Sequence, residues 1–341
     1  MSSEVGTPLL EVKDLRKTYE LRRMFSKPGL VKALDGVSFS LAKGKTLAVV
    51  GESGCGKSTL AKCLMLIEGI TSGEAVFEGR PLAETPPQDW RKQVQMIFQD
   101  PYSSLNPRKK CLDIIAEPLV IQGDLSKEEI YTRAREMMAK VGLRPEFESR
   151  YPHMFSGGQR QRIGIARALM LRPKLLICDE PVSALDVSIQ AQVLNLLMDL
   201  QDEFGLSYLF ISHDLSVVRH VSDHILVMYL GQVMEYGARD LVFKDAQNPY
   251  TQALLSSHPH LNEVEAGGSG NPHAAIQGEL PSPLNPPPGC PFQKRCPKVF
   301  ERCLNERPAL YNVKGRLSRC HLHDGVAGVT VAAAAPSSTA N

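Results

Sequence analysis

One stretch of the chain has the residue types and spacing of a phosphate-binding loop. Residues 51–58 read G-x-x-x-x-G-K-S, after the apolar run 46–50 and before residues 59–64, which have a helical pattern. The glycines let successive backbone N–H groups point inward at the positive end of a helix. Lys57 can then reach the β- and γ-phosphates, and the Ser58 hydroxyl can join Mg²⁺. We predict that a nucleotide is held by Gly51, Glu52, Ser53, Gly54, Cys55, Gly56, Lys57, Ser58 and Thr59.

A second candidate site lies at the end of another apolar run. Residues 175–178 are apolar and deliver the adjacent carboxylates of Asp179 and Glu180. Mg²⁺–nucleotide chemistry needs such a pair, with Asp179 holding the metal through water and Glu180 polarising the attacking water. The next buried run, 206–211, is followed by His213, which this position favours as a sensor of the γ-phosphate.

A third element combines glycines with a helix start. Ser156, Gly157, Gly158 and Gln159 precede a run whose apolar residues share one helical face. Ser156 occupies the expected N-cap position. Two glycines beside a helix N-terminus form a second anion-binding element.

The elements that position these motifs follow from apolar periodicity and turn residues. Residues 20–32, which carry several Lys and Arg around Pro28-Gly29, are expected to form a basic surface loop. Ser126 and Glu129 fit a capping box that begins a helix over 126–141. Strands are expected at 9–19, 37–41, 46–50, 73–79, 94–99, 175–180 and 206–211, a helix at 187–204, and a small helical insertion at 105–150.

Composition excludes several classes of protein. The chain has 341 residues and a net charge of +2, which gives no electrostatic case for nucleic-acid binding. No apolar run approaches the roughly 18 residues that span a bilayer, and the N-terminus lacks a signal-peptide pattern. We therefore expect a cytosolic chain with reduced thiols.

The eight cysteines fall into two groups of four. The first group is scattered and comprises Cys55, Cys63, Cys111 and Cys178, of which Cys63 and Cys178 lie in apolar runs and are expected to be buried and inert. Four others, Cys290, Cys296, Cys303 and Cys320, follow a Pro-rich stretch, which favours a metal or an iron–sulfur cluster over disulfides in the cytosol. Their spacings are wider than those usual for zinc. An iron–sulfur cluster, zinc and unligated thiols all stay open on spacing alone.

The ordered set of motifs resembles the ATP-binding subunit of an ATP-binding cassette (ABC) transporter over about residues 8–255. By this resemblance Tyr19 stacks on adenine, and Gln99 joins Mg²⁺ while sensing the membrane partner. Residues 156–159 cap the γ-phosphate bound by a facing subunit, Asp186 lies in a loop that crosses the interface, and His213 is the switch histidine. Phe155 stands where leucine is commonest, a mild apolar change. Because no catalytic position is degenerate, we expect a chain competent for hydrolysis.

A narrower resemblance is carried by residues 100–108, 151–154, 248–251 and 278–290, which are similar to the dipeptide/oligopeptide importer ATPases, in particular the second dipeptide-permease type. It implies ATP-driven import of di- or oligopeptides at the cytoplasmic face of a bacterial inner membrane. The implied partners are two permease subunits, a second ABC ATPase in a head-to-tail dimer and, indirectly, a periplasmic or lipid-anchored peptide-binding protein. Related ATPases carry a [4Fe–4S] cluster in this tail, and the four tail cysteines match that pattern.

The expected fold is α/β: an ABC-type P-loop ATPase with a RecA-like core, an antiparallel β subdomain, a helical subdomain and a C-terminal Cys-containing extension. The expected domains are the ATPase (8–258, with its helical subdomain at about 100–172), a linker (259–277), the extension (278–323) and a disordered tail (324–341). Two alternatives remain. A non-transport cassette ATPase usually has two cassettes or a long coiled-coil insertion, and a phosphate-loop kinase leaves residues 156–159 and His213 unexplained.

Overall fold

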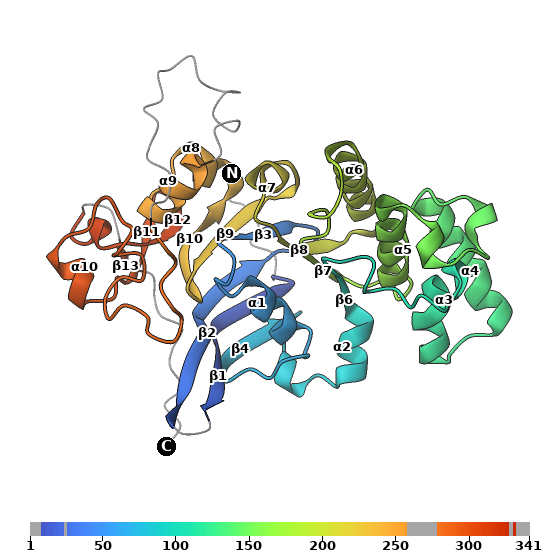
Figure 1. The fold of residues 1–341 in the computed structure, drawn as a ribbon, viewed down its shortest axis with the longest axis horizontal. Coiled ribbons are helices and arrows are strands. Elements are labelled where there is room, and N and C mark those ends of the chain that lie inside the picture. The colour runs from blue at the N-terminus through green and yellow to red at the C-terminus, as the bar shows by residue number, and fades with distance from the viewer. Residues whose placement is uncertain (1–7, 24–25, 258–277, 327–329, 332–341) are drawn as a thin grey trace, which may run out of the picture. The chain divides into compact units, whose positions relative to one another are not determined.

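The computed structural model describes residues 8–23, 26–257, 278–326 and 330–331 (Figure 1). The chain comprises two compact units. Unit 1 comprises Met1–Leu41, Leu47–Ala83 and His213–Asn341. Unit 2 comprises Ala42–Thr46 and Glu84–Ser212.

Unit 1 contains a four-stranded antiparallel sheet with the strand order β2-β1-β4-β5. Its strands are β1 (Leu10–Arg23), β2 (Ser26–Leu41), β4 (Ser72–Phe77) and β5 (Arg80–Pro81). The prediction of a surface loop over 20–32 is wrong, because β1 and β2 pair through this region, with Glu20 opposite Leu30. A neighbouring strand supplies the backbone hydrogen bonds, and this pairing overrides the local composition.

The phosphate loop follows a second set of strands in unit 1. Strand β3 (Thr46–Val50) runs parallel to β9 (His224–Tyr229), which pairs antiparallel with β10 (Gln232–Ala238). The order continues through β12 (Arg316–Arg319), β11 (Leu310–Val313) and β13 (Thr330–Val331). The helices are α1 (Lys57–Leu64), α7 (Leu215–Val221), α8 (Arg239–Lys244), α9 (Pro249–Ser256) and α10 (Glu301–Asn305).

The core of unit 1 joins the C-terminal segment to the strands that carry the loop. Val50 of β3 and Tyr229 of β9 belong to the same buried apolar cluster as Tyr250 of α9 and Phe292. Burial of such large side chains stabilises each by about 1.5–3 kcal/mol relative to exposure. The segment around Phe292 is therefore packed into the core of unit 1.

Unit 2 combines a parallel sheet with helices. Strands β6 (Val94–Ile97), β7 (Leu175–Asp179) and β8 (Ser207–Ile211) pair in that order. The helices are α2 (Pro87–Gln93), α3 (Cys111–Gln122), α4 (Lys127–Lys140), α5 (Gly157–Leu169) and α6 (Val187–Phe204). The capping box is confirmed, because Ser126 Oγ accepts from Glu129 N and Glu129 Oε2 accepts from Ser126 N.

The predicted linker, 259–277, lies outside the described residues. Of the predicted tail, the structure describes 324–326 and the short strand β13, and the remainder lies outside the description. In the part of the chain that is described, no helix combines the length and apolarity needed to cross a membrane.

Candidate functional site

The phosphate loop requires glycine at two positions for steric reasons. Gly51 has φ +150°, and a Cβ there would lie 2.2 Å from the backbone oxygen of Met228. Gly56 has φ +109°, and its Cβ would lie 2.5 Å from the backbone oxygen of Ala33. Because backbone atoms cannot move aside as a side chain can, only glycine fits this tight curl between β3 and α1.

The loop holds a buried cation at the start of a helix. The Lys57 side chain is buried, and its Nζ donates to the carbonyl oxygens of Gly51 (2.8 Å) and Glu52 (3.1 Å). Within the described residues, no side chain caps the N-terminus of α1, and its first turn carries no acidic residue. A buried ammonium beside a helix N-terminus is the environment that an anion such as a phosphate seeks.

The acidic strand end belongs to unit 2. Asp179 is buried at the end of β7, and Glu180 follows with the unusual backbone angle φ +47°. The Glu180 amide donates to the Ile211 carbonyl at 3.0 Å, which anchors the turn on β8. A side chain held in the left-handed region outside glycine marks a position where surrounding structure fixes the geometry.

The structure brings Gln99 to Glu180, although 81 positions separate them in the sequence. Gln99 Nε2 donates to Glu180 Oε2 at 3.0 Å. Gln99 follows β6 and Glu180 follows β7, and these strands are parallel neighbours, so their carboxyl ends meet at one edge. The predicted metal-site and water-activating residues of unit 2 are thus adjacent.

Helix α5 begins as the sequence predicts. Ser156 Oγ accepts from Gln159 N at 3.4 Å, and Gln159 Oε1 accepts from Ser156 N at 3.0 Å, which completes a capping box. Gly158 lies against α6, where a Cβ would come 2.3 Å from Ile189 Cγ2. Phe155 is buried, with its ring edge-on to another aromatic ring, so the substitution for leucine preserves apolar packing.

The remaining predicted residues lie in strand β1 and near the starts of α6 and α7. Tyr19 lies in β1 with Lys17 Nζ 4.8 Å from its ring centroid. Asp186 is the exposed N-cap residue of α6. His213 is exposed and directly precedes Asp214, whose carboxylate caps α7. Tyr19, the phosphate loop and His213 belong to unit 1, and the other nucleotide-site residues belong to unit 2.

The four tail cysteines line one cavity in unit 1. Burial raises the pKa of Cys290 to about 12, and the nearby thiols of Cys320, Cys303 and Cys296 add to this rise. Cys290 N also donates to the Cys303 carbonyl at 2.8 Å. Residues that span 30 positions of the sequence are therefore gathered around one point.

The same cavity contains two polar atoms that suggest a ligand. Gln293 Nε2 and His321 Nδ1 are buried and have no hydrogen-bond partner within the described part of the chain. Neither residue is among the site residues predicted from the sequence. His321 directly follows Cys320 in the sequence, which is the one signal that could have indicated it, and no pattern indicates Gln293.

The four tail cysteines are chemically suited to bind a metal group. Four thiols are a complete ligand set for an iron–sulfur cluster or for zinc. The cavity measures about 20 Å³, which is room for about one water molecule. Among the described residues, no three or more His, Cys, Asp or Glu side chains are arranged to hold a metal ion. The four thiols would have to be rearranged to ligate one.

The cysteines of the ATPase region have a different environment. Burial raises the pKa of Cys63 to about 11 and the pKa of Cys178 far above its ordinary value. Both side chains are fully buried, so the prediction that these two thiols are buried is confirmed.

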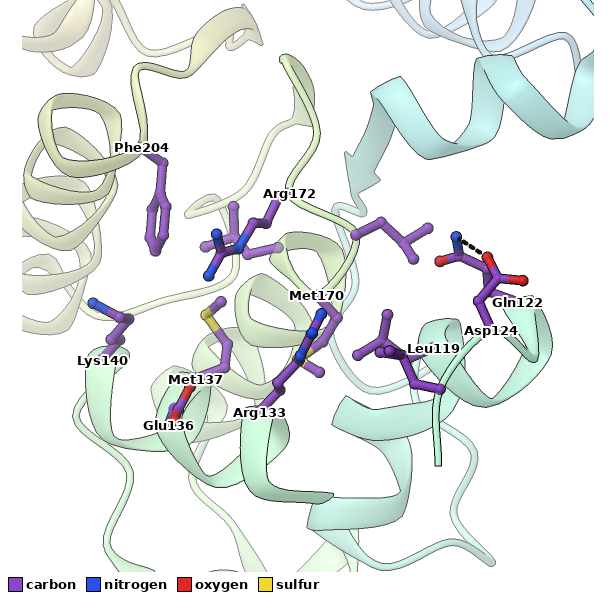
Figure 2. A pocket seen from close by; sticks show the side chains of 13 residues that line it. Leu119, Gln122, Asp124, Arg133, Glu136, Met137, Lys140, Met170, Arg172 and Phe204 are labelled. Carbon is purple, nitrogen blue, oxygen red and sulfur yellow. Dashed lines mark hydrogen bonds between the residues drawn. The ribbon is translucent and has the colours of Figure 1, made fainter. Parts of the chain in front are cut away.

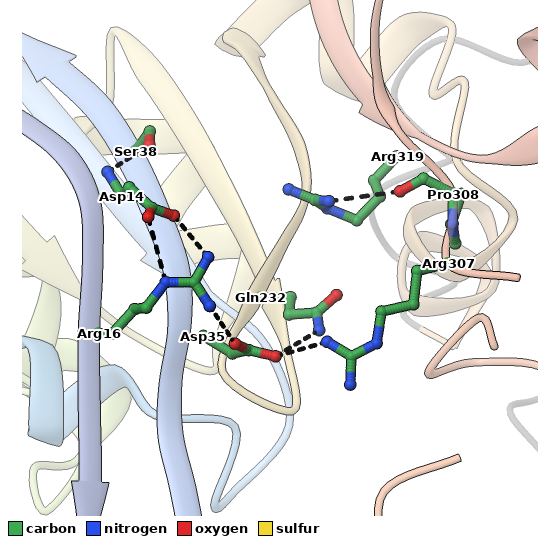
Figure 3. Close-up of polar contacts among 8 residues, drawn as sticks. All are labelled: Asp14, Arg16, Asp35, Ser38, Gln232, Arg307, Pro308 and Arg319. Carbon is green, nitrogen blue, oxygen red and sulfur yellow. Dashed lines mark hydrogen bonds and ion pairs between the residues drawn. The ribbon is translucent and has the colours of Figure 1, made fainter. Parts of the chain in front are cut away.

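A buried carboxylate ties the C-terminal segment to the antiparallel sheet of unit 1 (Figure 3). Asp35 of β2 accepts from Arg16 and Arg307, both at 2.7 Å, and from Gln232 Nε2 at 3.0 Å. Arg319 Nε donates to the Val233 carbonyl at 2.9 Å. Side chains from residues 307–319 therefore hold β2 and β10.

A separate cavity of about 280 Å³ lies in unit 2 (Figure 2). Its walls include Met137 of α4, Met170 and Phe204, with Arg133 and Arg172 beside them. None of the predicted site residues is among the described residues that line it. This cavity is distinct from the candidate nucleotide and cysteine sites.

Comparison with known proteins gives two family matches along the chain. Residues 34–183 match the ABC transporter family, and residues 234–303 match the family described as the C-terminal region of oligopeptide/dipeptide transporters. The dipeptide transport ATP-binding protein DppF of Escherichia coli (strain K12) is 55% identical over 331 residues, covering 95% of this chain and 98% of that protein. The oligopeptide transport ATP-binding protein AppF of Bacillus subtilis (strain 168) is 50% identical, covering 92% and 97%.

Solved structures show the same fold. The dimeric ATP-binding cassette MJ0796 in a post-hydrolysis state, bound to ADP and Pi, has a TM-score of 0.60 and 28% sequence identity. The similarity covers 67% of this chain and 98% of that one. CbiO1 from Clostridium perfringens, part of an ABC transporter complex, has a TM-score of 0.62 and 25% identity, covering 76% and 99%.

Proposed function

Because the chain belongs to the ATP-binding subunits of dipeptide and oligopeptide ABC transporters, we propose that it hydrolyses ATP to power import of di- or oligopeptides through a membrane permease. One observation carries this proposal: a single chain joins the ABC transporter match at 34–183 to the oligopeptide/dipeptide C-terminal region at 234–303. Near-complete coverage of the relatives by this chain supports it further. The domain division into an ATPase, a linker and an extension is part of the same proposal.

ATP binding rests on the phosphate loop and the residues beside it. The loop amides and the Lys57 ammonium hold the β- and γ-phosphates, and Tyr19 stacks on adenine. Ser58, Gln99 and, through water, Asp179 would hold Mg²⁺, which when bound would supply neutralisation of the phosphate charge. The burial of Lys57 among loop carbonyls supports this role, because a phosphate oxygen is a better partner for the ammonium than a neutral carbonyl.

Hydrolysis uses Glu180 as the group that accepts a proton from the attacking water. The hydrogen bond from Gln99 orients this carboxylate. His213 contacts the γ-phosphate and reports its loss. General-base catalysis of this kind contributes about 10²–10⁴-fold in rate.

Transport follows from closing and opening a head-to-tail dimer. Residues 156–159 and Asp186 of one cassette complete the nucleotide site of the facing cassette. ATP bridges the two surfaces, and hydrolysis removes the bridging anion so that the dimer opens. The facing cassette is a second ABC ATPase subunit, and two permease subunits carry the peptide delivered by a periplasmic or lipid-anchored binding protein. The chain then lies peripherally on the cytoplasmic face of the bacterial inner membrane and needs no nucleic acid.

The tail cysteines bind a [4Fe–4S] cluster in this proposal. Cys290, Cys296, Cys303 and Cys320 supply four thiolates, and the group ties together a segment rich in proline. The shared cavity and its two unpartnered nitrogens support a bound group. Protein purified without oxygen should be brown and contain about four iron atoms per chain. A colourless, zinc-loaded or metal-free protein would contradict the cluster.

The transport function is tested by purification of the tagged chain from solubilised membranes. Recovery of two multi-span permease chains and a second ABC ATPase is the expected result. Recovery of ribosomes, nucleic acid or no membrane protein would overturn the transport function and favour a non-transport cassette ATPase.

Catalysis is tested in the same preparation with Glu180→Gln. The amide oxygen can still accept the hydrogen bond from Gln99, so ATP binding should persist while turnover falls by about 10²–10⁴-fold. Turnover within threefold of the original chain would remove Glu180 from this role.

A further inference from the structure

A short segment of the C-terminal extension lies against the phosphate loop. Residues 290–296 run between two of the tail cysteines and place Phe292 in the core of unit 1. The Phe292 ring centroid is 5.5 Å from that of Tyr229 and 5.2 Å from that of Tyr250. The two tyrosines are 4.7 Å apart and complete a buried aromatic cluster.

Arg295 reaches from this segment to an acidic residue of the loop. Its Nη1 donates to Glu52 Oε1 and Oε2, both at 2.9 Å, and to the Tyr229 hydroxyl at 3.3 Å. The Arg295 side chain is 6% exposed and that of Glu52 is 25% exposed. This ion pair joins residues 243 positions apart and is mostly withdrawn from solvent.

The loop backbone is held at the same place. The Glu52 amide donates to the Tyr250 hydroxyl at 3.1 Å, and Tyr250 is fully buried. Tyr250 is itself positioned by Asn248, whose Oδ1 accepts from its amide at 2.9 Å. Glu52 is therefore fixed through both its backbone and its side chain by residues that follow the ATPase motifs.

The negative charge of Glu52 is unfavourable in a site that binds an anion. Its carboxylate lies in the loop that curls around the phosphates, where an uncompensated negative charge repels ATP. Like charges in one loop repel more strongly where the effective dielectric constant is near 20 than they do in bulk water. Arg295 removes this repulsion because it pairs with the carboxylate and holds it away from solvent.

We propose that Arg295 is a positioning residue of the nucleotide site, which neutralises Glu52 and fixes the phosphate loop in its binding conformation. The extension thus contributes directly to ATP affinity in addition to any transport role. This inference rests on the proposed binding of nucleotide phosphates by residues 51–58.

If Arg295 neutralises Glu52, substitution of Arg295 and substitution of Glu52 should change ATP affinity by different amounts. Arg295→Ala leaves Glu52 unpaired beside the phosphates and should weaken Mg²⁺–ATP binding at least about tenfold. Glu52→Gln removes the repelling charge and should change affinity by less than threefold. In the double variant the charge is absent again, so affinity should return to within about threefold of the Glu52→Gln value.

The experiment measures the dissociation constant of a fluorescent ATP analogue with Mg²⁺ on the full chain, together with Tm without nucleotide. Arg295→Lys keeps the charge and should recover most of the affinity lost in Arg295→Ala. Arg302→Ala is the matched control, because Arg302 pairs with Glu306 on an exposed surface of the extension. Its affinity should equal that of the original chain.

The outcomes separate this inference from the proposed function. Lys57→Ala with unchanged affinity would overturn phosphate binding by the loop. If Lys57→Ala loses binding but Arg295→Ala does not, the role of Arg295 is refuted. A double variant as weak as Arg295→Ala, with both retaining the original Tm, would refute neutralisation of Glu52. Should Arg295→Ala fail to fold, Arg295→Gln replaces it with the same expected loss and the same rescue by Glu52→Gln.

Discussion

Replacement of Asp35 by Asn should destabilise unit 1 by removing one buried charge that serves three partners (Figure 3). The Asp35 side chain is 6% exposed, whereas those of Arg16 and Arg307 are 41% and 43% exposed. Asn has nearly the same volume but no charge, so it can satisfy only some of the donors. The Gln232 amide, which is buried, then competes with two arginines for one oxygen.

The size of the effect follows from exposure. Each arginine regains water when its partner is lost, so each ion pair contributes at most about 1 kcal/mol. A buried amide left without an acceptor costs about 1–3 kcal/mol. The sum is about 1–5 kcal/mol, and its midpoint of about 3 kcal/mol lowers Tm by about 6–12 °C for a body of 150–250 residues.

The pH dependence has a definite sign. Burial raises the pKa of Asp35, but hydrogen bonds from Arg307 and Gln232 and the charges of Lys32 and Arg307 outweigh it, so the pKa lies below the ordinary 3.8. A lowered pKa gives stability that is fully present above the ordinary value and is lost as the pH falls through the folded-state value. The Tm difference between the original chain and Asp35→Asn should stay constant from about pH 8 to pH 5.5 and shrink below about pH 4.

Thermal unfolding by circular dichroism across this pH range is the assay. The control is Asp240→Asn, since the pKa of Asp240 is also lowered by Arg239 but its side chain is 67% exposed. Its Tm should change by less than about 2 °C. An equal effect of the two substitutions, or a difference that shrinks already between pH 8 and 6, would refute the reasoning from burial.

Two further substitutions test packing near the sites. Gly158→Ala places a Cβ 2.3 Å from Ile189 Cγ2 and should lower the free energy of unfolding by about 1–3 kcal/mol. The control is Gly164→Ala in the same helix, whose Cβ meets nothing within 4 Å and which should stabilise α5 by about 0.5–1 kcal/mol. Equal urea midpoints for the two variants would contradict the steric explanation. Asn248→Ala removes the side-chain oxygen that accepts a hydrogen bond from the Tyr250 amide at the start of α9. It also removes the hydrogen bonds that Asn248 Nδ2 donates to the carbonyls of Met234 at 3.1 Å and Arg319 at 2.9 Å. Since these groups are buried, about 2–4 kcal/mol should be lost in urea unfolding, and a loss under 0.5 kcal/mol would show that water replaces the side chain.

Local patterns determined the elements that carry the chemistry. The phosphate loop, the N-caps at Ser126 and Ser156, the acidic end of β7 and the span of α6 all lie where the sequence predicts. Each of these elements depends on contacts between residues close in the sequence. In an N-cap, for example, a side-chain oxygen accepts a hydrogen bond from the backbone amide of the residue three positions later. Such contacts can be inferred from spacing alone.

Long-range pairing decided the rest. Residues 20–32 have the composition of a loop, but the pairing of β1 with β2 makes most of them strand. Nothing in local spacing joins Gln99 to Glu180, gathers Gln293 and His321 with the tail cysteines, or places Arg295 on Glu52. These contacts are set by which strands are neighbours and by how the core packs, and neither is encoded in the periodicity of any one segment. The sequence by itself determined the chemistry of the nucleotide site, and the tertiary structure decided which distant residues hold it in place.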